Sequence, residues 1–501
     1  MPATTIITIG ALIYVAILVG ISIFASRSVQ NSADFIVAGR RLPLGLCVFT
    51  VFATWFGSGT LIGAAGAAYS GGFRGVLANP FGSALCLLLA GVFYARVLRR
   101  LKLLTLPDLF HLRFGRWAEI IAALSIIPAY IGWVGSIFVA FGTVLNVVAG
   151  VDFQTAIFIC ALITIGYTVW GGMWAVSLTD FFQAIIIIAG LLVLFPIVIN
   201  DIGGLQNLIQ QAPPGHFQLA PESTFYGWIM FMQGLLVIGL GNIASQDLLQ
   251  RVFSARDEYV AQWSMYISSF FYLTIAMIPV LIGIAATVVL PDIANPAFVL
   301  PEMGKLYLPP LAMALFTGAM ISALMSSADG GMLAPACIFS ENIMRPLKSN
   351  ITKSSDLNVT RWTVVVVGIL GLLTALYFQN VYQLMIKSFS ILMVGLFVPM
   401  TAAIYWKKAN QVGAVASALG GLLSWLFFEY LNHVGSTIQL PSELMAAFVG
   451  LVLQIGMTLL SQSFNPPKTL SDIDGNAIVM SDFLGVLSLP SRPVRRIHSG
   501  E

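Results

Sequence analysis

Two carboxylates and a pair of adjacent hydroxyls are the chemically distinctive residues of this sequence. Ser326, Ser327 and Asp329 follow one another in the apolar segment ISALMSSADGGML, and Ala323 lies about one helical turn before the two serines. Asp180 lies in a second apolar segment, YTVWGGMWAVSLTDFFQ. Carboxylate and hydroxyl oxygens are hard ligands of the kind that sodium prefers. These residues therefore predict a sodium site.

The same residues also have a purely structural interpretation. The two serines could bond back to carbonyls of their own helix, and Asp329 could cap a kink at Gly330–Gly331. Asp180 could be a charge at a helix N-terminus, which the helix dipole stabilises, or a loop residue. A carboxylate inside a membrane costs roughly 2.5–3.5 kcal/mol on insertion scales and needs a cation or a partner. Two such carboxylates in one chain favour the ion site.

Clusters of small residues predict interruptions in two helices. One lies in ATWFGSGTLIGAAGAAYSGG, and a similar one lies five apolar segments later in GLLVIGLGNIASQ. Unwound backbone exposes carbonyl oxygens that can replace the water around a sodium ion. Glycine and alanine could instead serve only to let helices pack closely. The matched spacing of the two stretches favours paired broken helices, which are typical of inverted-repeat transporters.

The composition requires a membrane around these elements. Of 501 residues, 58% are apolar and 9% are charged, whereas soluble domains carry about 25% charged residues. Apolar runs of about 20 residues span a bilayer as helices. We expect thirteen such spans, at 4–26, 43–70, 76–95, 119–149, 154–172, 175–199, 225–246, 264–290, 306–335, 360–379, 384–406, 412–431 and 442–461. The first has no signal-peptide features and is read as a true span.

The basic residues predict the orientation. With the N-terminus outside, all of the 24 Lys and Arg residues fall in inner segments except Arg74, Lys305 and Lys387. Cytoplasmic segments are enriched in Lys and Arg. We therefore expect an integral protein of the plasma (inner) membrane with a cytoplasmic C-terminus. The net charge of +3 then reflects topology, and no nucleic-acid partner is expected.

The sequence resembles the sodium:solute symporter family over spans 2–12. The resemblance is carried by DFIVAGRRLPLG, LTLPDLFHLRFG, YTVWGGMWAVSLTDFFQ, SQDLLQRVFSARD and MSSADGGMLAPACIFSENI. The high-affinity choline transporters are the most similar branch, on ATWFGSGTLIGAAGAAY and SALMSSADGGML. The resemblance implies an all-α polytopic protein with about 13 transmembrane helices and a LeuT-like core of five-plus-five inverted repeats. The implied regions are an N-terminal extra helix and loop (1–42), the first repeat (43–200), an outer loop with the second repeat (201–411), two peripheral helices (412–461) and a cytoplasmic tail (462–501).

The resemblance also implies a sodium site between spans 2 and 9. Its ligands would be the carbonyls of Ala53, Phe56 and Ala323 and the hydroxyls of Ser326 and Ser327. Bound sodium would then join the two spans and favour the state that binds solute.

Some family members have a second sodium site nearer the cytoplasm. Its positions match Asp180, Ser326 and Asp329 of this chain. Where those members carry hydroxyls this chain has Asp329 and then Gly330, which strengthens one ligand and removes another. The number of sodium ions carried in each cycle therefore stays open.

For the solute, the choline branch implies an aromatic cage that holds a quaternary ammonium by cation–π attraction. Trp55 and Trp133 match two members of that cage, whereas two further aromatic positions align with Ser83 and Ser245. An aspartate of that branch aligns with Ser390. Choline or another quaternary ammonium is therefore the alternative solute and not the first expectation.

A lysine in span 11 changes the expected charge of the solute. Lys387 lies beside the solute pathway implied by the resemblance, so we expect a carboxylate-bearing or zwitterionic solute with Lys387 as its partner. Lys387 could instead extend to the membrane surface. Gln246 could reach the solute from the second broken helix. Arg251 is expected to anchor the end of that helix and to pair with Asp247 or Asp257.

Other classes of membrane protein fit less well. An intramembrane enzyme would need a GxGD or HExxH motif, and none surrounds the two acids, so no catalytic residue is expected. A channel would show a repeated filter, and none is visible. We expect sodium-coupled symport of a small organic solute by alternating access. The rival from another class is a transporter-like solute sensor that acts through a separate partner.

Overall fold

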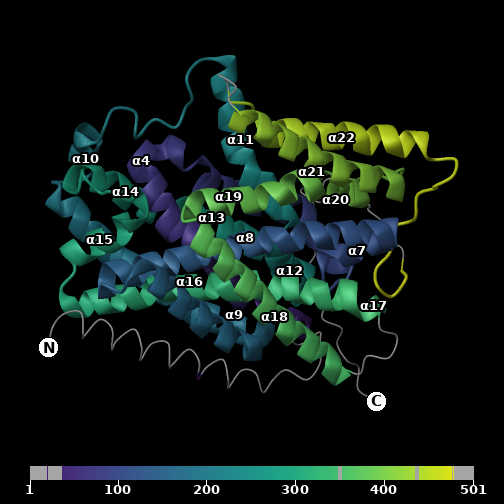
Figure 1. Cartoon of the computed structure of the whole chain (residues 1–501), viewed down its shortest axis with the longest axis horizontal. Helices are drawn as coiled ribbons and strands as arrows, with labels where there is room; N and C mark the ends of the chain where they lie inside the picture. The colour runs from purple at the N-terminus through teal and green to yellow at the C-terminus, as the bar shows by residue number, and fades with distance from the viewer. Residues whose placement is uncertain (1–19, 21–35, 348–352, 435–438, 477, 479–501) are drawn as a thin grey trace, which may run out of the picture.

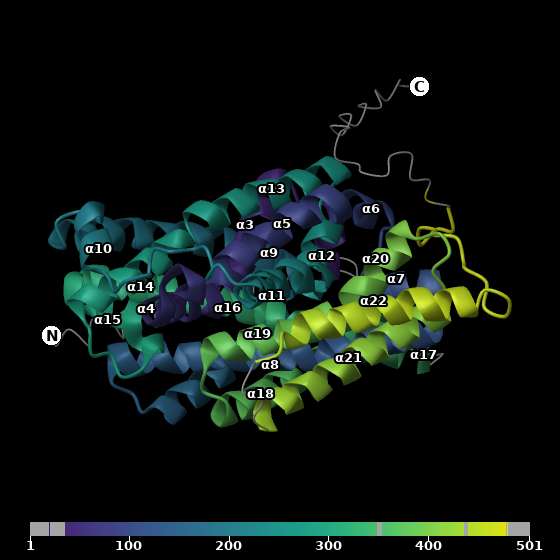
Figure 2. The ribbon, with the colours of Figure 1, turned by 90° about the horizontal axis from the view of Figure 1, so that it is seen from above.

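The computed structural model describes residue 20, residues 36–347, 353–434 and 439–476, and residue 478. The predicted first span, 4–26, lies almost wholly outside these residues, as does most of the tail. The regular secondary structure of the described chain is helical, and an isolated bridge joins Leu42 to Ala255. The architecture is an elongated bundle of long helices (Figures 1 and 2).

Ten helices of the described chain are long and apolar enough to cross a membrane, and a bent pair supplies an eleventh. A segment inside a membrane must satisfy its backbone hydrogen bonds internally, which a helix does. A long apolar run therefore predicts a membrane-spanning helix. The ten are Leu77–Arg100, Arg116–Ala149, Val176–Asp201, Phe225–Ala244, Glu258–Val289, Pro310–Leu347, Asn358–Tyr377, Val381–Tyr405, Gln411–Val434 and Ser442–Leu460, and the bent pair is Leu44–Trp55 with Ser58–Gly75.

The predicted fifth and sixth spans belong to one helical element, α9 (Phe153–Asp201). A straight helix of 49 residues would be about 73 Å long at about 1.5 Å per residue. Both ends of α9 nevertheless lie near the short helix α15 (Val299–Tyr307): Lys305 reaches the carbonyl of Val147 just before α9, and Tyr307 donates to Asp201 at its end. The element therefore turns back on itself, and its two arms are the two predicted spans.

The first predicted break is confirmed. Helix α3 (Leu44–Trp55) ends at Phe56, and a π-helical turn (Ser58–Gly63) leads into α4 (Ala64–Gly75), with a bend of 54° between the two halves. Gly57 lies in the break with non-helical backbone angles. A Cβ atom there would lie 1.8 Å from the Ser327 hydroxyl oxygen, so the break packs directly on the helix that carries the two serines.

The second predicted break is also confirmed. Helix α11 (Phe225–Gly241) passes into a short 3₁₀ turn (Asn242–Ala244), and Ser245 is fully extended with φ −83° and ψ 135°. Helix α12 (Gln246–Ser254) begins directly after this extended residue. All nine residues of α12 are buried, so this broken end lies inside the bundle.

The serine helix, α16 (Pro310–Ile338), is the most enclosed membrane helix, with 83% of its apolar window buried. It packs against α8 (Arg116–Ala149) and α9. Helices α21 (Gln411–Val434) and α22 (Ser442–Leu460) pack on each other at one edge of the bundle (Figures 1 and 2). Their outward side chains are apolar, as lipid contact requires.

We predict that Gly57→Ala destabilises the junction between the first break and α16. The added methyl group would meet the Ser327 side chain at 1.8 Å, and over-packing of this kind costs about 1–3 kcal/mol. The measurement is thermal unfolding of the purified protein in detergent. The matched control is Gly456→Ala on α22, where a Cβ atom meets nothing within 4 Å. Equal melting temperatures for the two variants would contradict the described contact.

Candidate functional site

Charged side chains are buried in the centre of the bundle, between the two breaks. Asp180 on α9 and Asp247 on α12 are both fully buried, and Arg251 on α12 is only 1% exposed. Two carboxylates against one guanidinium leave a formal negative charge when all three are ionised. Removing charges from water costs several kcal/mol per ion unless they are paired and hydrogen-bonded. The centre of the bundle is therefore built to attract cations.

Asp180 joins three helices. Its carboxylate accepts hydrogen bonds from Thr50 on α3 and from Ser326 on α16, the latter at 2.5 Å, and a longer one of 3.4 Å from Thr54. The guanidinium of Arg251 lies 3.8 Å away. Asp180 is thus neither a loop residue nor a charge at a free helix N-terminus, which were the structural alternatives.

The two adjacent serines face different partners. Ser326 donates to Asp180, whereas Ser327 donates to the main-chain carbonyl of Thr54 at 2.7 Å. Neither hydroxyl bonds back to a carbonyl of its own helix. The alternative in which the two serines only bond back along α16 is therefore wrong. Ser327 already reaches the backbone of span 2, one residue from Ala53.

The residues expected to bind the first sodium ion lie around that contact. Ala53, Phe56, Ala323, Ser326 and Ser327 are all buried. The carbonyl oxygen of Ala323 lies 3.4 Å from the position of a Cβ atom on Gly57, directly beside the first break. The end of α3 and the middle of α16 therefore present hydroxyl and carbonyl oxygens to each other, which is the chemistry that a dehydrated sodium ion needs.

Asp329 lies apart from this contact. It accepts a hydrogen bond of 2.6 Å from Thr168, which is on the first arm of α9, and is 4% exposed. Helix α16 continues through Gly330 and Gly331, so Asp329 does not cap a kink there. Asp180 and Asp329 both connect α16 to α9, at two different levels of the bundle.

The expected pairing of Arg251 is wrong. Its guanidinium donates to the Thr54 hydroxyl at 2.7 Å and to the main-chain carbonyl of Asp247 at 3.1 Å, not to a carboxylate of Asp247 or Asp257. The carboxylate of Asp257 instead caps the next helix through the amide of Val260. Arg251 bridges the two broken helices because its side chain turns back along α12 toward α3.

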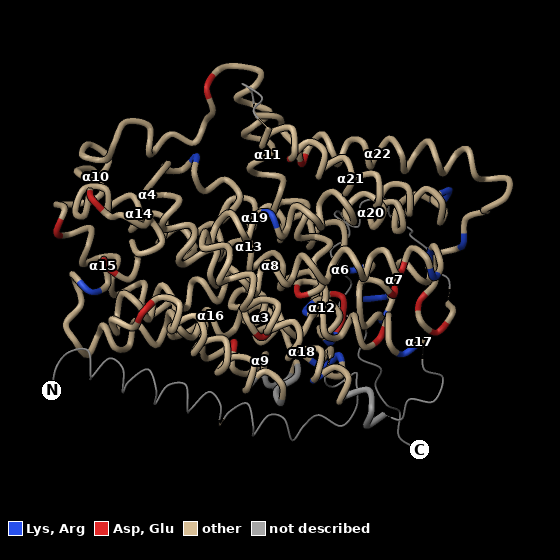
Figure 3. The backbone as a smooth tube through the Cα atoms, viewed as in Figure 1, with Lys and Arg blue, Asp and Glu red and all other residues tan. Residues whose placement is uncertain are grey.

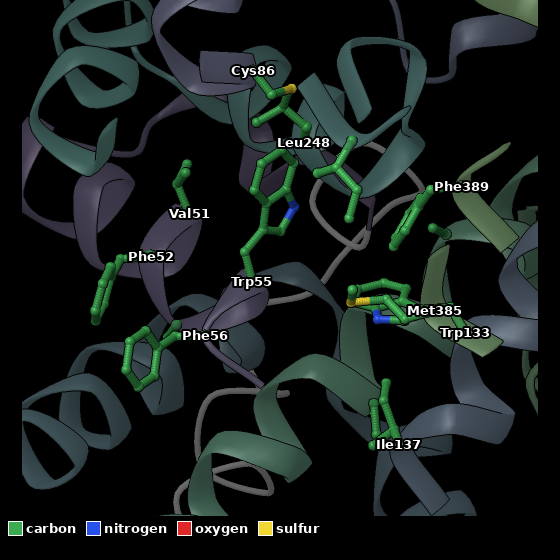
Figure 4. Packing of buried hydrophobic residues seen from close by; sticks show 14 of the residues in the cluster. Val51, Phe52, Trp55, Phe56, Cys86, Trp133, Ile137, Leu248, Met385 and Phe389 are labelled. Atoms are coloured by element: carbon green, nitrogen blue, oxygen red, sulfur yellow. The ribbon is translucent and has the colours of Figure 1, made fainter. Parts of the chain in front are cut away.

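One of the two expected solute tryptophans, Trp55, contacts the Asp247 carboxylate, and the other, Trp133, lies beside a second partner of that carboxylate, Tyr130. Trp55 donates its indole N–H to one carboxylate oxygen at 2.5 Å, and the Tyr130 hydroxyl donates to the other. The rings of Tyr130 and Trp133 meet edge to face with centroids 5.7 Å apart. Figure 4 shows Trp55 and Trp133 extending from different helices toward one region, with Phe389 beside Trp133.

A pocket of about 450 Å³ lies beside the first break. It is lined by residues of the π-helical turn and α4, by the segment around Asn295, and by the start of α19 (Val381–Leu392), including Tyr382. Met385, less than one turn farther along α19, lies beside Trp133 (Figure 4). The pocket therefore shares helix α19 with the region of Trp133.

Asp247 and Tyr130 are site residues that the sequence reasoning missed. From the sequence, Asp247 is expected only as a partner for Arg251. The available signal was a third carboxylate in an apolar setting, two residues after the serine that replaces a cage aromatic. Tyr130 gave no signal of its own, because a tyrosine in an apolar helix is more often a packing residue.

Two expected solute contacts are not at this site. The Gln246 side chain accepts from the amide of Leu106 at 2.7 Å and donates to the carbonyl of Leu104, so it holds the loop before α7 (Leu106–Phe114). It lies at the start of α12 but on the side away from the tryptophans' carboxylate.

Lys387 faces the peripheral helices. Its ammonium lies 2.7 Å from Glu429 on α21 and 3.4 Å from Glu443 on α22, and 6.0 Å from the centre of the Trp425 ring. Ser390, one turn later, donates to the same Glu443 carboxylate. The lysine neither extends alone to the surface nor joins the tryptophans, because its face of α19 is the one that packs on α21 and α22.

The model of the sodium:solute symporter family matches residues 35–421. The high-affinity choline transporter 1 of Drosophila melanogaster is 31% identical over 433 residues, covering 82% of this chain and 69% of the relative. The human high affinity choline transporter 1 is 30% identical, covering 83% and 75%. The sodium/pantothenate symporter of Escherichia coli is 26% identical, covering 87% and 94%.

Solved structures show the fold. A Na⁺-coupled sialic acid symporter in a substrate-bound outward-open state superposes with a TM-score of 0.79 at 22% identity, covering 93% of this chain and 99% of that one. Mhp1, a nucleobase-cation-symport-1 family transporter, superposes with a TM-score of 0.60 at 14% identity, covering 87% and 97%. The expected all-α, LeuT-like architecture is confirmed.

We predict that Ser326→Ala and Ser327→Ala each weaken sodium binding while the protein stays folded. Loss of one hydrogen-bonding oxygen beside a charge costs about tenfold or more in affinity. The measurement is the sodium concentration that gives half of the maximal thermal stabilisation, titrated against potassium. Thr317→Ala is the control, because Thr317 is buried on the same helix and bonds to its own backbone. Wild-type sodium midpoints in both serine variants would exclude these hydroxyls as ligands.

We predict that Lys387→Met lowers stability because it leaves Glu443 buried without its cation. The expected loss is about 1–3 kcal/mol, since the lysine is half exposed and its pairs are partly screened. The double variant Lys387→Met/Glu443→Gln should recover part of that loss. The measurement is thermal unfolding in detergent. Additive effects of the two substitutions would show that the pair contributes no coupling energy.

Proposed function

This chain belongs to the sodium:solute symporter family, and from that membership we propose that a small organic solute crosses the membrane with sodium through the site between the two broken helices. The protein is an integral membrane protein that carries out sodium-coupled symport and is not an enzyme. The observation that supports the position of the site is the meeting of both helix breaks at a buried group of carboxylates, hydroxyls and carbonyls around Asp180, Ser327 and Asp247.

The first sodium ion is proposed to bind the carbonyls of Ala53, Phe56 and Ala323 and the hydroxyls of Ser326 and Ser327. Support comes from the bond between Ser327 and the backbone of α3, which already brings span 2 onto span 9. Sodium at this position would take the Ser327 hydroxyl oxygen as a ligand, and the O–H group would turn away from the Thr54 carbonyl. The ion would then replace one hydrogen bond by several ion–oxygen contacts across the same interface.

A second sodium ion is proposed to bind Asp180, Ser326 and Asp329. The hydrogen bond between Ser326 and Asp180 supports two of these ligands. To bind this ion, the Asp329 carboxylate would have to give up its hydrogen bond from Thr168 or accept that bond and the ion together. The second site therefore needs a rearrangement between α16 and α9 that the first site does not.

Sodium would drive transport by its different affinity for two conformations. An ion that bridges α3 and α16 stabilises the conformation in which these helices are close, and the solute gains affinity by the same free energy. Each net charge that moves inward gains about 2.3 kcal/mol per 100 mV of membrane potential. One or two sodium ions are therefore enough to accumulate a solute strongly.

The proposed orientation has the N-terminus outside, the C-terminus in the cytoplasm and the chain in the plasma (inner) membrane. Lys and Arg residues gather at the end of the bundle that carries α6 (Ala95–Arg100), α7 and α12, and few lie near α10 (Leu205–Gln211) and α15 (Figure 3). Under the positive-inside rule the first end is cytoplasmic. The pocket beside α4 then opens to the outside.

The proposed repeats are 43–200 and 201–411, preceded by 1–42 and followed by the peripheral helices (412–461) and the tail (462–501). Each repeat would begin with a broken membrane helix, α3–α4 in one and α11–α12 in the other. The two breaks meet at the proposed site, as expected for inverted repeats that share a central binding site.

The solute is proposed to lie between Trp55 and Trp133. A solute carboxylate paired with Lys387 loses its support, because that ammonium already has two carboxylate partners. Relatives at 30–31% identity are choline transporters, and a positively charged solute is therefore the stronger candidate. The sensor alternative needs a separate partner protein.

We predict sodium-dependent counterflow in proteoliposomes. Vesicles preloaded with a cationic solute such as choline or ethanolamine should exchange it for the same labelled solute from the medium in sodium and not in potassium. Empty liposomes give the background. Binding of the amine in sodium without any exchange would favour the sensor, whereas equal exchange in potassium would contradict sodium coupling.

A further inference from the structure

We propose that Asp247 is the counter-ion of a positively charged nitrogen on the transported solute. This inference rests on the proposed function and narrows it to a class of substrate: protonated amines and zwitterions that carry an ammonium group. The geometry that leads to it is the position of one carboxylate between the two helix breaks and the two tryptophans.

Asp247 lies at the meeting point of the site. It is the second residue of α12, directly after the extended Ser245, and it contacts Trp55 in the first broken helix and Tyr130 beside Trp133. The tyrosine is doubly tied to it, because the Asp247 amide also donates to the Tyr130 hydroxyl oxygen at 2.8 Å. A solute held between the tryptophans would therefore touch this carboxylate.

The carboxylate of Asp247 has donors but no cation. None of the ion pairs within the described ranges involves it, and the nearest cation, Arg251, contacts only its main-chain carbonyl. Arg251 turns instead toward Thr54 and Asp180. A buried carboxylate without a counter-charge is expensive, and a cationic solute supplies that charge only when it is bound.

The carboxylate also keeps room for further donors. Each of its oxygens accepts one hydrogen bond, from Trp55 and Tyr130 respectively, and each can accept a second. In the same break, the side-chain oxygen of Asn242 is buried and accepts no hydrogen bond within the described chain. Unused acceptors of this kind match a solute with N–H groups to donate.

Two small residues border the same region. Ser83 on α5 (Ser83–Leu89) and Ser245 are both buried, and both replace aromatic cage residues implied by the choline resemblance. With the aromatic faces gone, cation–π attraction is reduced. A formal charge two residues after Ser245 can take over the recognition, and it favours a protonated amine, which can donate hydrogen bonds, over a quaternary one.

A purely structural role for Asp247 would be to hold Trp55 and Tyr130 in place. A neutral acceptor can do the same, so Asp247→Asn separates the two roles. The amide oxygen keeps an acceptor for one of the two donors and removes the charge. Asp247→Glu keeps the charge and moves it by one methylene group.

The test uses matched solutes that differ in the charged nitrogen. The purified full-length protein is titrated, in sodium and in potassium, with ethanolamine against ethylene glycol and with β-alanine against 3-hydroxypropionate, and thermal stabilisation is measured. We expect stabilisation in sodium by the amine of at least one pair and not by its hydroxyl counterpart. Asp247→Asn should weaken that binding by about tenfold or more, and Asp247→Glu should retain part of it.

Controls separate this inference from the symporter assignment. Sodium-induced stabilisation without solute should persist in Asp247→Asn, which shows that the variant is folded. Glu443→Gln removes another buried carboxylate, on α22, and should leave amine binding unchanged. Stabilisation by the hydroxyl counterparts alone, by neither member of any pair, or wild-type amine binding in Asp247→Asn would overturn the role of Asp247. Amine binding that is equal in sodium and potassium would instead contradict sodium coupling and leave Asp247 in place.

Discussion

Burial of charge in a low-dielectric interior is the constraint on which the centre of this protein depends. Asp180 on α9 is fully buried, and α3 and α16 each supply it with a hydroxyl donor while α12 supplies a guanidinium. Those partners can meet because two of the four helices are broken, which frees backbone carbonyls and changes the direction of the chain. The buried carboxylates need partners that the two breaks bring within reach. The first break in turn packs directly on α16, which leaves no room for a side chain at Gly57.

Much of this architecture can be predicted from the sequence, because lipid imposes simple rules. Apolar length gives the spans, and clusters of small residues gave both breaks at the right places. Ser326, Ser327 and Asp180 could be placed in one site because each is a polar residue with no other reason to be in a membrane helix. The reversal inside α9 was implied as well, because the sequence predicts two consecutive spans, 154–172 and 175–199, within this element.

Side-chain direction could not be predicted in the same way. Lys387 lies on a helix that borders the proposed pathway, and only the packing of α19 on α21 and α22 shows that its ammonium faces Glu429 and Glu443. Gln246 and Asp247 are neighbours in sequence, yet one holds a loop and the other contacts Trp55. A rotation of about 100° per residue in a helix separates these roles, and the phase of α12 follows from the extended Ser245.

The Lys387 ion pairs have a consequence for the modularity of the chain. The lysine lies inside the part that matches the family, residues 35–421, while Glu429 and Glu443 lie beyond it. The matched region therefore depends on the two helices that follow it for the partners of Lys387. A chimera that moved it alone onto the peripheral helices of a relative without these acids would leave an uncompensated ammonium at a helix interface.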